Sequence, residues 1–425
     1  MSVDFKTYQS PTGKRNNYNE GCEENSFPQQ MENRSDNLSL GTKTEEMEDT
    51  DSTSNIPKEQ TEMSTGDDLP SDSESIGSSI RACSEVSSAP DKYGFIGGAQ
   101  YTEDGEFKIP VEIVRRRERK WLEMFNTWDK FMLKKYRKVR DRCRKGIPSS
   151  VRARAWQHLC GADKLMEANK NVFDRLVNLP IDPRTEDDIR KDLHRQFPLH
   201  EMFLEKGGNG QEDLFRVLKV HAQVSPDGYC QAHAPLGAVL LMQMPAEAAF
   251  WCLRAICDKY VPGYYSPGLE AIQIDGEILF KLLKRISPSA YRHIKKQKIE
   301  PVLYMTEWFM CLFSRTLPWS SVLRVWDIFF CEGVKVLFRV GLVLLKYGLR
   351  PQITKQCPSM YETVQALRNI DHSIMVEHFL TFQMQNLNLT EEMLQKEHEK
   401  QMKKRLLEKQ NVGFNFSEGG TRSAC

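Results

Sequence analysis

The sequence predicts an all-α protein: a multi-helix domain between a disordered N-terminal region and a polar C-terminal extension. Two observations carry this prediction. Apolar residues recur at helical spacing through residues 144–350, and breaks containing glycine or proline separate the periodic stretches. In the same region, no dipeptide typical of a β-hairpin lies between alternating segments, and no short repeat of solenoid type occurs.

Composition limits the function classes. The 425 residues carry a formal net charge of +1, which argues against bulk attraction to nucleic acid or to a membrane surface. The 11 cysteines form no C-x-x-C pair and no zinc-type Cys/His spacing. We therefore expect no metal, and buried thiols in a reducing compartment. No apolar run has the length of a transmembrane segment and no signal sequence is evident, so a cytoplasmic location is expected.

The N-terminal part divides into two segments. Residues 1–92 are acidic, rich in serine and poor in aromatic residues, so they cannot bury enough surface to fold. Removing this disordered region should leave the fold and the activity unchanged. Residues 93–143 are predicted to form a lead-in amphipathic helix, because Trp121, Phe125 and Trp128 recur at helical spacing.

The main domain is predicted over residues 144–350, and two segments follow it. The breaks between its helices lie at 146–148, 179–183, 207–210, 225–228, 261–268, 287–288 and 317–320. Residues 351–410 are predicted as a helical extension that ends in a solvated or transiently docked helix with a thin apolar stripe. Residues 411–425 are predicted as a flexible tail, and their last letters, TRSAC, lack the pattern expected for a PDZ partner.

The first candidate site lies in the stretch IRKDLHRQFP, residues 189–198. If the helix runs up to the proline, Ile189, Leu193 and Phe197 share one face, and Arg195 points away from it. Asp192 precedes Arg195 by one turn, at a spacing that permits an ion pair. From these residues alone, Arg195 is either a surface partner of Asp192 or an arginine held out for a ligand.

The second candidate site lies in DGYCQAHAPLGAVLL, residues 227–241. Gly228 permits a tight turn, and the small and apolar run after it predicts a buried helix. Gln231 therefore sits where a loop enters a core helix, and its simplest role there is to cap backbone groups. Cys230 and His233 lack the surroundings of a cysteine nucleophile. The sequence contains no P-loop, so the chain has no expected nucleotide site of its own.

These residues, taken with others along the chain, resemble the TBC-domain family of GTPase-activating proteins for Rab-type small GTPases. The resemblance covers about residues 145–350. Four motifs carry it, in the family's order: Arg152 and Trp156 in an R-x-x-x-W opening; Ile189, Asp192 and Arg195 in I-x-x-D-x-x-R; Tyr229 and Gln231 in Y-x-Q; Trp326 and Asp327 in a later Trp-Asp segment. The strings YGFIGG, DLHRQFPLHEMF and GYCQAHAP are similar to the subfamily that contains carabin.

The resemblance implies a function in trans. Arg195 would be an arginine finger on the nucleotide of a Rab-type GTPase in its GTP form, and Gln231 would orient the attacking water. Asp192 would support the arginine, and the R-x-x-x-W and Trp-Asp residues would hold the fold. GTP and Mg²⁺ would be carried by the partner, and the chain would need no cofactor. It would regulate vesicle trafficking, peripherally at endosomal or plasma membranes.

Two departures and two alternatives accompany this interpretation. Gln196 stands where threonine is common in the family, and Ala232-His233-Ala234 stands where Gly-Met-Asn is common. A Cβ at Ala232 limits how closely the loop can approach a partner. One alternative function is a signalling scaffold of TBC fold that binds a GTPase without accelerating hydrolysis. The other is a nucleic-acid binder built on the basic runs RRRERK (115–120) and KKYRKVR (134–140), which the nearly neutral net charge disfavours.

Overall fold

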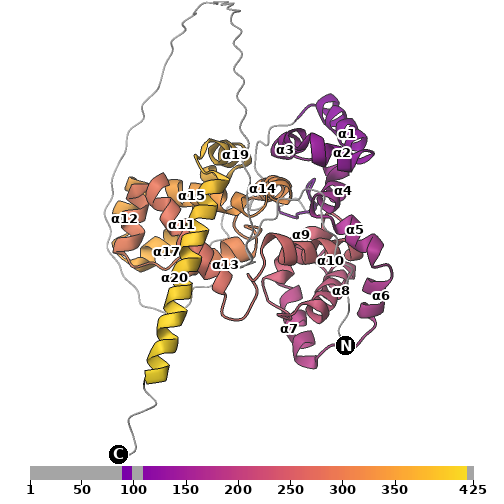
Figure 1. The fold of residues 1–425 in the computed structure, drawn as a ribbon. Coiled ribbons are helices and arrows are strands. Elements are labelled where there is room, and N and C mark those ends of the chain that lie inside the picture. The colour runs from indigo at the N-terminus through magenta and orange to yellow at the C-terminus, as the bar shows by residue number, and fades with distance from the viewer. Residues whose placement is uncertain (1–88, 98–108, 419–425) are drawn as a thin grey trace, which may run out of the picture. The chain divides into compact units, whose positions relative to one another are not determined.

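A computed structural model describes residues 89–97 and 109–418, with side chains as far as residue 408 (Figure 1). The described residues are predominantly helical, and their β structure is limited to an isolated bridge between Phe95 and His200. The predicted all-α fold is therefore confirmed. Within the described ranges, no helix is both long enough and apolar enough to cross a membrane.

The first half of the fold runs from α1 to the π-helical segment η1. Its elements are α1 (Val111–Phe125), α2 (Trp128–Lys134), α3 (Tyr136–Arg144), α4 (Ser149–Cys160), α5 (Ala162–Ala168), α6 (Val172–Val177), α7 (Pro183–Leu193), α8 (Asn209–Val224), α9 (His233–Leu241), α10 (Ala246–Ala255) and η1 (Ile256–Tyr260). Helices α8, α9 and α10 pack against one another, and α7 lies along α8. Every residue of α9 is buried, as its apolar sequence predicted.

The second half runs from α11 to α20. Its elements are α11 (Glu270–Ile286), α12 (Pro288–Lys296), α13 (Val302–Met310), α14 (Trp319–Glu332), α15 (Lys335–Gly348), α16 (Pro351–Lys355), α17 (Met360–Arg368), α18 (His372–Met375), α19 (Glu377–Asn386) and α20 (Glu391–Glu418). Helix α11 packs against α12, α13, α15 and α20. Helix α14 contacts α3 and α4 from the first half as well as α15 and α19, so it joins early and late parts of the chain.

The lead-in segment contains three helices and not the single amphipathic helix that the sequence predicted. Helix α1 ends at Phe125, and Thr127 leaves the helical region with φ −137° before α2 begins. Asparagine and threonine both disfavour a helix interior, which explains the break. The predicted apolar face is nevertheless correct, because Trp121, Phe125 and Trp128 are buried.

A buried carboxylate connects the start of the main domain to α14. Asp327 is fully buried, and its Oδ1 accepts hydrogen bonds from Trp156 Nε1 at 2.8 Å and from Arg152 Nε at 3.1 Å. Its Oδ2 accepts from the backbone N–H of Ile147 at 2.7 Å. Burial raises the pKa of Asp327, while Arg152 opposes this shift. The ring centroids of Trp156 and Trp326 lie 5.6 Å apart beside this carboxylate.

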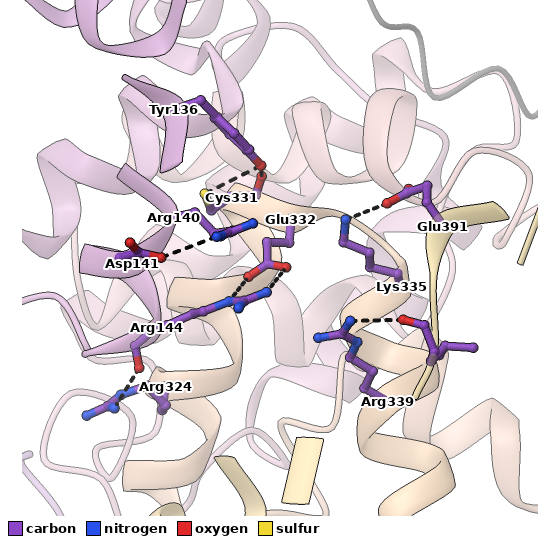
Figure 2. A network of polar contacts seen from close by, with 11 residues as sticks. Tyr136, Arg140, Asp141, Arg144, Arg324, Cys331, Glu332, Lys335, Arg339 and Glu391 are labelled. Atoms are coloured by element: carbon purple, nitrogen blue, oxygen red, sulfur yellow. Dashed lines mark hydrogen bonds and ion pairs between the residues drawn. The ribbon is translucent and has the colours of Figure 1, made fainter. Parts of the chain in front are cut away.

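A second polar network holds the far end of α14 (Figure 2). Glu332, the last residue of α14, forms a bidentate ion pair with Arg144 of α3, with Nε–Oε1 and Nη2–Oε2 distances of 2.5 and 2.7 Å. The Tyr136 hydroxyl donates to the Cys331 carbonyl oxygen at 2.8 Å. From α15, Arg339 donates to the carbonyl of Leu389 at 3.0 Å, just ahead of α20. The network therefore links α3, the junction of α14 with α15, and the residues that lead into α20.

Helix α20 is docked, and it is longer than predicted. It packs along α11 and buries Leu394, His398 and Gln401. Arg405 donates a hydrogen bond to Gln273 of α11 at 3.2 Å. The helix continues to Glu418, through a segment that we predicted as flexible tail, and the rest of that tail (419–425) lies outside the described residues. The sequence showed only a thin apolar stripe because part of the contact is polar.

A short N-terminal segment, residues 89–97, packs on the loop that follows α7. We call this segment the strap. Its Phe95 is fully buried, with its ring centroid 5.3 Å from that of Trp319 and 6.3 Å from that of Phe197. The N–H of Ile96 donates to the carbonyl of Leu199 at 2.8 Å. The strap begins inside the region 1–92 that we predicted as disordered, so that boundary was placed a few residues too late; residues 1–88 lie outside the described part.

The strap predicts a sharp difference between two truncations. Removing residues 1–88 keeps the strap and should leave the free energy of unfolding unchanged. Removing residues 1–97 should lower it by about 1–3 kcal/mol, less than a typical core Phe→Ala loss because a terminal strap can detach locally. Denaturant unfolding measures both. Hydrogen exchange across residues 194–203 should be faster only in the longer truncation, and equal exchange in the two proteins would contradict the assigned contact.

Candidate functional site

Helix α7 presents Arg195 just beyond its C-terminal end. The helix begins at Pro183 after the N-cap Asp182, whose Oδ2 accepts from the Thr185 N–H at 3.0 Å. Ile189 is fully buried and fixes the inner face. The helix ends at Leu193, earlier than predicted, and Phe197 reaches the core from a left-handed backbone conformation with φ +42°. Arg195 therefore stands on a turn and not on a helix.

Asp192 holds the two candidate motifs together. It is buried, and its Oδ1 pairs with Arg195 Nη2, as the sequence spacing predicted. Its Oδ2 accepts a hydrogen bond from the Tyr229 hydroxyl at 2.7 Å. The Arg195 side chain remains 48% exposed, against 6% for Asp192. One buried carboxylate thus fixes an exposed guanidinium and ties it to a loop that lies 37 residues further along the chain.

Gln231 lies exposed on that loop, two residues before α9. Gly228 has φ +69°, so the tight turn predicted there is present. Tyr229 is half-buried, and burial raises the pKa of its phenol well above the usual value, so it stays a neutral donor to Asp192. We call residues 225–231 the glutamine loop.

Side chains outside the predicted motifs hold the glutamine loop from the other side. Ser266 Oγ donates to Asp227 Oδ2 at 2.9 Å, from the segment before α11. Arg254 of α10 donates through Nη1 to the Val224 carbonyl at 3.2 Å, at the end of α8. The Cys230 N–H donates to His233 Nδ1 at 3.2 Å. The loop is therefore fastened at its start, middle and end, while Gln231 stays exposed.

Comparison with known proteins agrees with these motifs. A family model described as the Rab-GTPase-TBC domain matches residues 149–354. Carabin of Mus musculus is 45% identical over 342 residues, which cover 78% of this chain and 76% of carabin. The chain belongs to the Rab-GTPase-TBC domain family. TBC1 domain family member 10B of Mus musculus is 56% identical over 342 residues, covering 80% of this chain but only 43% of that relative.

A solved structure shares the fold of this TBC domain. The crystal structure of the Chlamydomonas flagellar RabGAP TBC domain superposes with a TM-score of 0.55 at 25% identity. The matched region covers 70% of this chain and the whole of the Chlamydomonas chain. The likeness to carabin also confirms the subfamily that the sequence strings indicated.

The four TBC motifs form two groups in this structure. Arg152, Trp156 and Asp327 meet in the buried cluster described above, and Trp326 packs beside them, so these residues hold the fold. The residues of I-x-x-D-x-x-R and Y-x-Q meet at Asp192. The first group presents little charge to solvent, since Asp327 is fully buried and the side chain of Arg152 is only 11% exposed. The second presents a permanent cation and an amide to solvent, which is chemistry suited to an oxyanion and a water molecule.

Sequence reasoning missed several residues that position this second group. It used the strap string YGFIGG only for the subfamily resemblance and did not predict its contact with the loop after α7. It gave no role to Ser266 or Asp227, because loop-to-loop hydrogen bonds leave no periodic signal. It placed Gln196 only as a departure from the family pattern, whereas its side chain donates to the Asp192 carbonyl at 2.9 Å and braces the turn.

Proposed function

We propose that this chain is a GTPase-activating protein for a Rab-type small GTPase in its GTP form. The observation that carries the proposal is the shared carboxylate of Asp192, which holds exposed Arg195 beside the loop of exposed Gln231. Membership of the TBC family supports it. The partner would bring GTP and Mg²⁺, and this chain would contribute side chains only.

Each exposed side chain has one task in the proposed mechanism. Arg195 reaches the transferring phosphoryl group, where its planar guanidinium spreads over two oxygens as negative charge redistributes. Gln231 holds the attacking water in line. Arginine supplied in trans accelerates hydrolysis by roughly 10³–10⁵, which corresponds to about 4–7 kcal/mol. The free energy needed to separate Arg195 from Asp192 is far smaller than this gain, because an ion pair whose guanidinium is half-exposed contributes about 0–1 kcal/mol.

The position of Asp192 explains why the pair need not inhibit the chain. Without a partner, Asp192 keeps the guanidinium close to its working position and limits the rotamers that binding must select. When Arg195 moves to the phosphoryl group, the Tyr229 hydroxyl still donates to the same carboxylate. The buried carboxylate of Asp192 then keeps one hydrogen-bond donor, which reduces the cost of separating it from Arg195.

The proposal is tested by phosphate release from a panel of GTP-loaded Rab-type GTPases under single-turnover conditions. We expect at least one GTPase to be accelerated by about 10³ or more. Binding to a GTP-loaded partner with no acceleration across the panel would instead support a scaffold. Because membrane association would come through the partner, soluble GTPases without membranes suffice for this test.

Tyr229→Phe should separate positioning from chemistry. The variant removes only the hydroxyl that donates to Asp192, so the carboxylate and the glutamine loop lose their direct connection. We expect the saturated rate to fall by about 5–10-fold, the equivalent of one hydrogen bond, and the free energy of unfolding by about 1 kcal/mol. Tyr361→Phe is the matched control, because Tyr361 is 68% exposed on α17. An unchanged rate in Tyr229→Phe would remove the coupling role of Asp192.

A further inference from the structure

Behind the glutamine loop lies a cluster of three side chains that the proposed mechanism does not use. His221 lies in the last turn of α8, His233 opens α9, and Cys257 lies on η1. One ligand atom from each residue lies within 4.8 Å of the others. The ring centroids of His221 and His233 are 4.5 Å apart. A π-helical turn is rare and is frequently found at functional sites.

The two histidines are buried without the hydrogen bonds that buried polar groups normally have. Each is 1% exposed. In the described part of the chain, neither ring nitrogen of His221 has a hydrogen-bond partner, and neither does Nε2 of His233. Tyr265 packs edge-on against His233 at 4.4 Å, but its hydroxyl donates to the Met310 carbonyl. Such unpaired nitrogens are costly in a core unless something binds them.

We propose that His221, His233 and Cys257 form a zinc site. Two imidazoles and a thiolate suit Zn²⁺, with a fourth, open position for water. Bonds of about 2.0–2.3 Å in a tetrahedral site need ligand atoms about 3.3–3.8 Å apart, so the cluster contracts by about 1 Å on binding. We expect rotation of the three side chains about their χ angles to supply this contraction.

The two histidines are already in the neutral form that binds zinc, whereas the cysteine must lose a proton to bind it. Burial lowers the pKa of His221 well below its usual value and that of His233 to about 3, so both rings are neutral at pH 7. Burial raises the pKa of the Cys257 thiol, so zinc displaces its proton as the Zn–S bond forms. Arg254 lies near the cluster, and its ion pair with Asp258 offsets its positive charge.

Zinc at this site would disturb the glutamine loop. His233 Nδ1 accepts from the Cys230 N–H, and a neutral imidazole has one N–H, so the proton of this ring is on Nε2. A metal at Nε2 requires that proton to move to Nδ1, where it opposes the Cys230 N–H. The hydrogen bond between the Cys230 N–H and His233 must then break. Because Gln231 directly follows Cys230 in the chain, the loss of this bond would disturb Gln231 as well. From this step we expect zinc to inhibit hydrolysis, an expectation that rests on the proposed function. The binding of zinc itself does not rest on the proposed function.

Cobalt titration of the reduced, metal-free full chain tests the site. One equivalent of Co²⁺, the spectroscopic substitute for Zn²⁺, should give visible ligand-field bands of a four-coordinate ion and a near-ultraviolet thiolate band. Cys257→Ser should lose the thiolate band and weaken binding at least about tenfold. Cys311→Ser, a buried cysteine outside the cluster, should retain both. Thermal melts verify folding, and His221→Gln gives a second ligand variant if Cys257→Ser does not fold.

Two outcomes would overturn the zinc site. The first is a wild-type chain with no four-coordinate cobalt spectrum, in which case the cluster holds water only. The second is an unchanged spectrum in a folded ligand variant, which would place the metal elsewhere. Hydrogen exchange tests the coupling separately: Zn²⁺ should speed exchange of the Cys230 amide at least about tenfold in the wild type and not in Cys257→Ser. None of these readouts requires hydrolysis, so failure of the proposed function would not imitate failure of the site.

Discussion

Arg195→Ala is expected to slow GTP hydrolysis by a stimulated partner at least about 10²-fold while the chain stays folded and still binds that partner. The side chain is half-exposed and lies away from the apolar face of α7, so its removal empties no core position. Its charge matters chiefly as charge redistributes over the phosphoryl oxygens. The loss should therefore fall on the rate at saturation more than on binding. Single-turnover phosphate release at saturating activator measures it.

Arg190→Ala is the matched control for this prediction. Arg190 lies on α7, which ends just before Arg195; its side chain is 47% exposed, and it pairs with Glu186 as Arg195 pairs with Asp192. Its loss should leave the rate within about threefold of the wild type, as expected for a surface ion pair. Arg195→Lys should be nearly as slow as Arg195→Ala, because an ammonium cannot reproduce the planar fork. Equal rates for Arg195→Ala and Arg190→Ala would return Arg195 to a surface partner of Asp192.

Gln231→Ala extends the same argument. We expect it to be slow as well, because the attacking water loses its orienting amide. The double variant with Arg195→Ala should lose less than the product of the two single losses, since the residues act on one transition state.

Asp327→Ala is expected to lower the free energy of unfolding by about 3–5 kcal/mol, the loss typical of breaking a buried ion pair. The change leaves Arg152, Trp156 Nε1 and the Ile147 N–H without their common acceptor inside the core. Denaturant unfolding at neutral pH measures the loss, and the rate per folded molecule should change little.

The control for Asp327→Ala is the same substitution at an aspartate on the surface. Asp258→Ala removes the partner of Arg254, and Asp258 is 51% exposed, so we expect a loss below about 1 kcal/mol. Similar losses in the two variants would show that the Asp327 cluster does not hold the start of the domain to α14.

The sequence predicted the helices well where one side of a segment is apolar. The inner face of α7 follows directly from residue spacing, and the buried α9 follows from its small and apolar run. The pair between Asp192 and Arg195 also agrees with a separation of three residues, which permits an ion pair. It failed where the chain leaves the helix. Phe197 is buried as predicted, but from a left-handed turn that packing against the strap and Trp319 stabilises.

The remaining contacts depend on residues far apart in the chain. Tyr229 and Asp192 are 37 residues apart, and Trp156 and Asp327 are 171 apart, so local patterns carry no sign of either contact. The family motifs indicated which residues matter but not which of them touch. The His221–His233–Cys257 cluster draws one residue from each of three elements, and for that reason the search for zinc-type spacing in the sequence did not find it.

The most direct test of the account is binding to the partner in three nucleotide states: GDP, a non-hydrolysable GTP analogue, and GDP with aluminium fluoride, which imitates the transferring phosphoryl group. The account predicts that the wild type and Arg190→Ala bind the aluminium fluoride state at least about 10²-fold tighter than the GDP state. Arg195→Ala should lose that gain and keep its affinity for the GTP-analogue state. Equal preference for the aluminium fluoride state in Arg195→Ala and the wild type would contradict the assignment of Arg195 to the transition state.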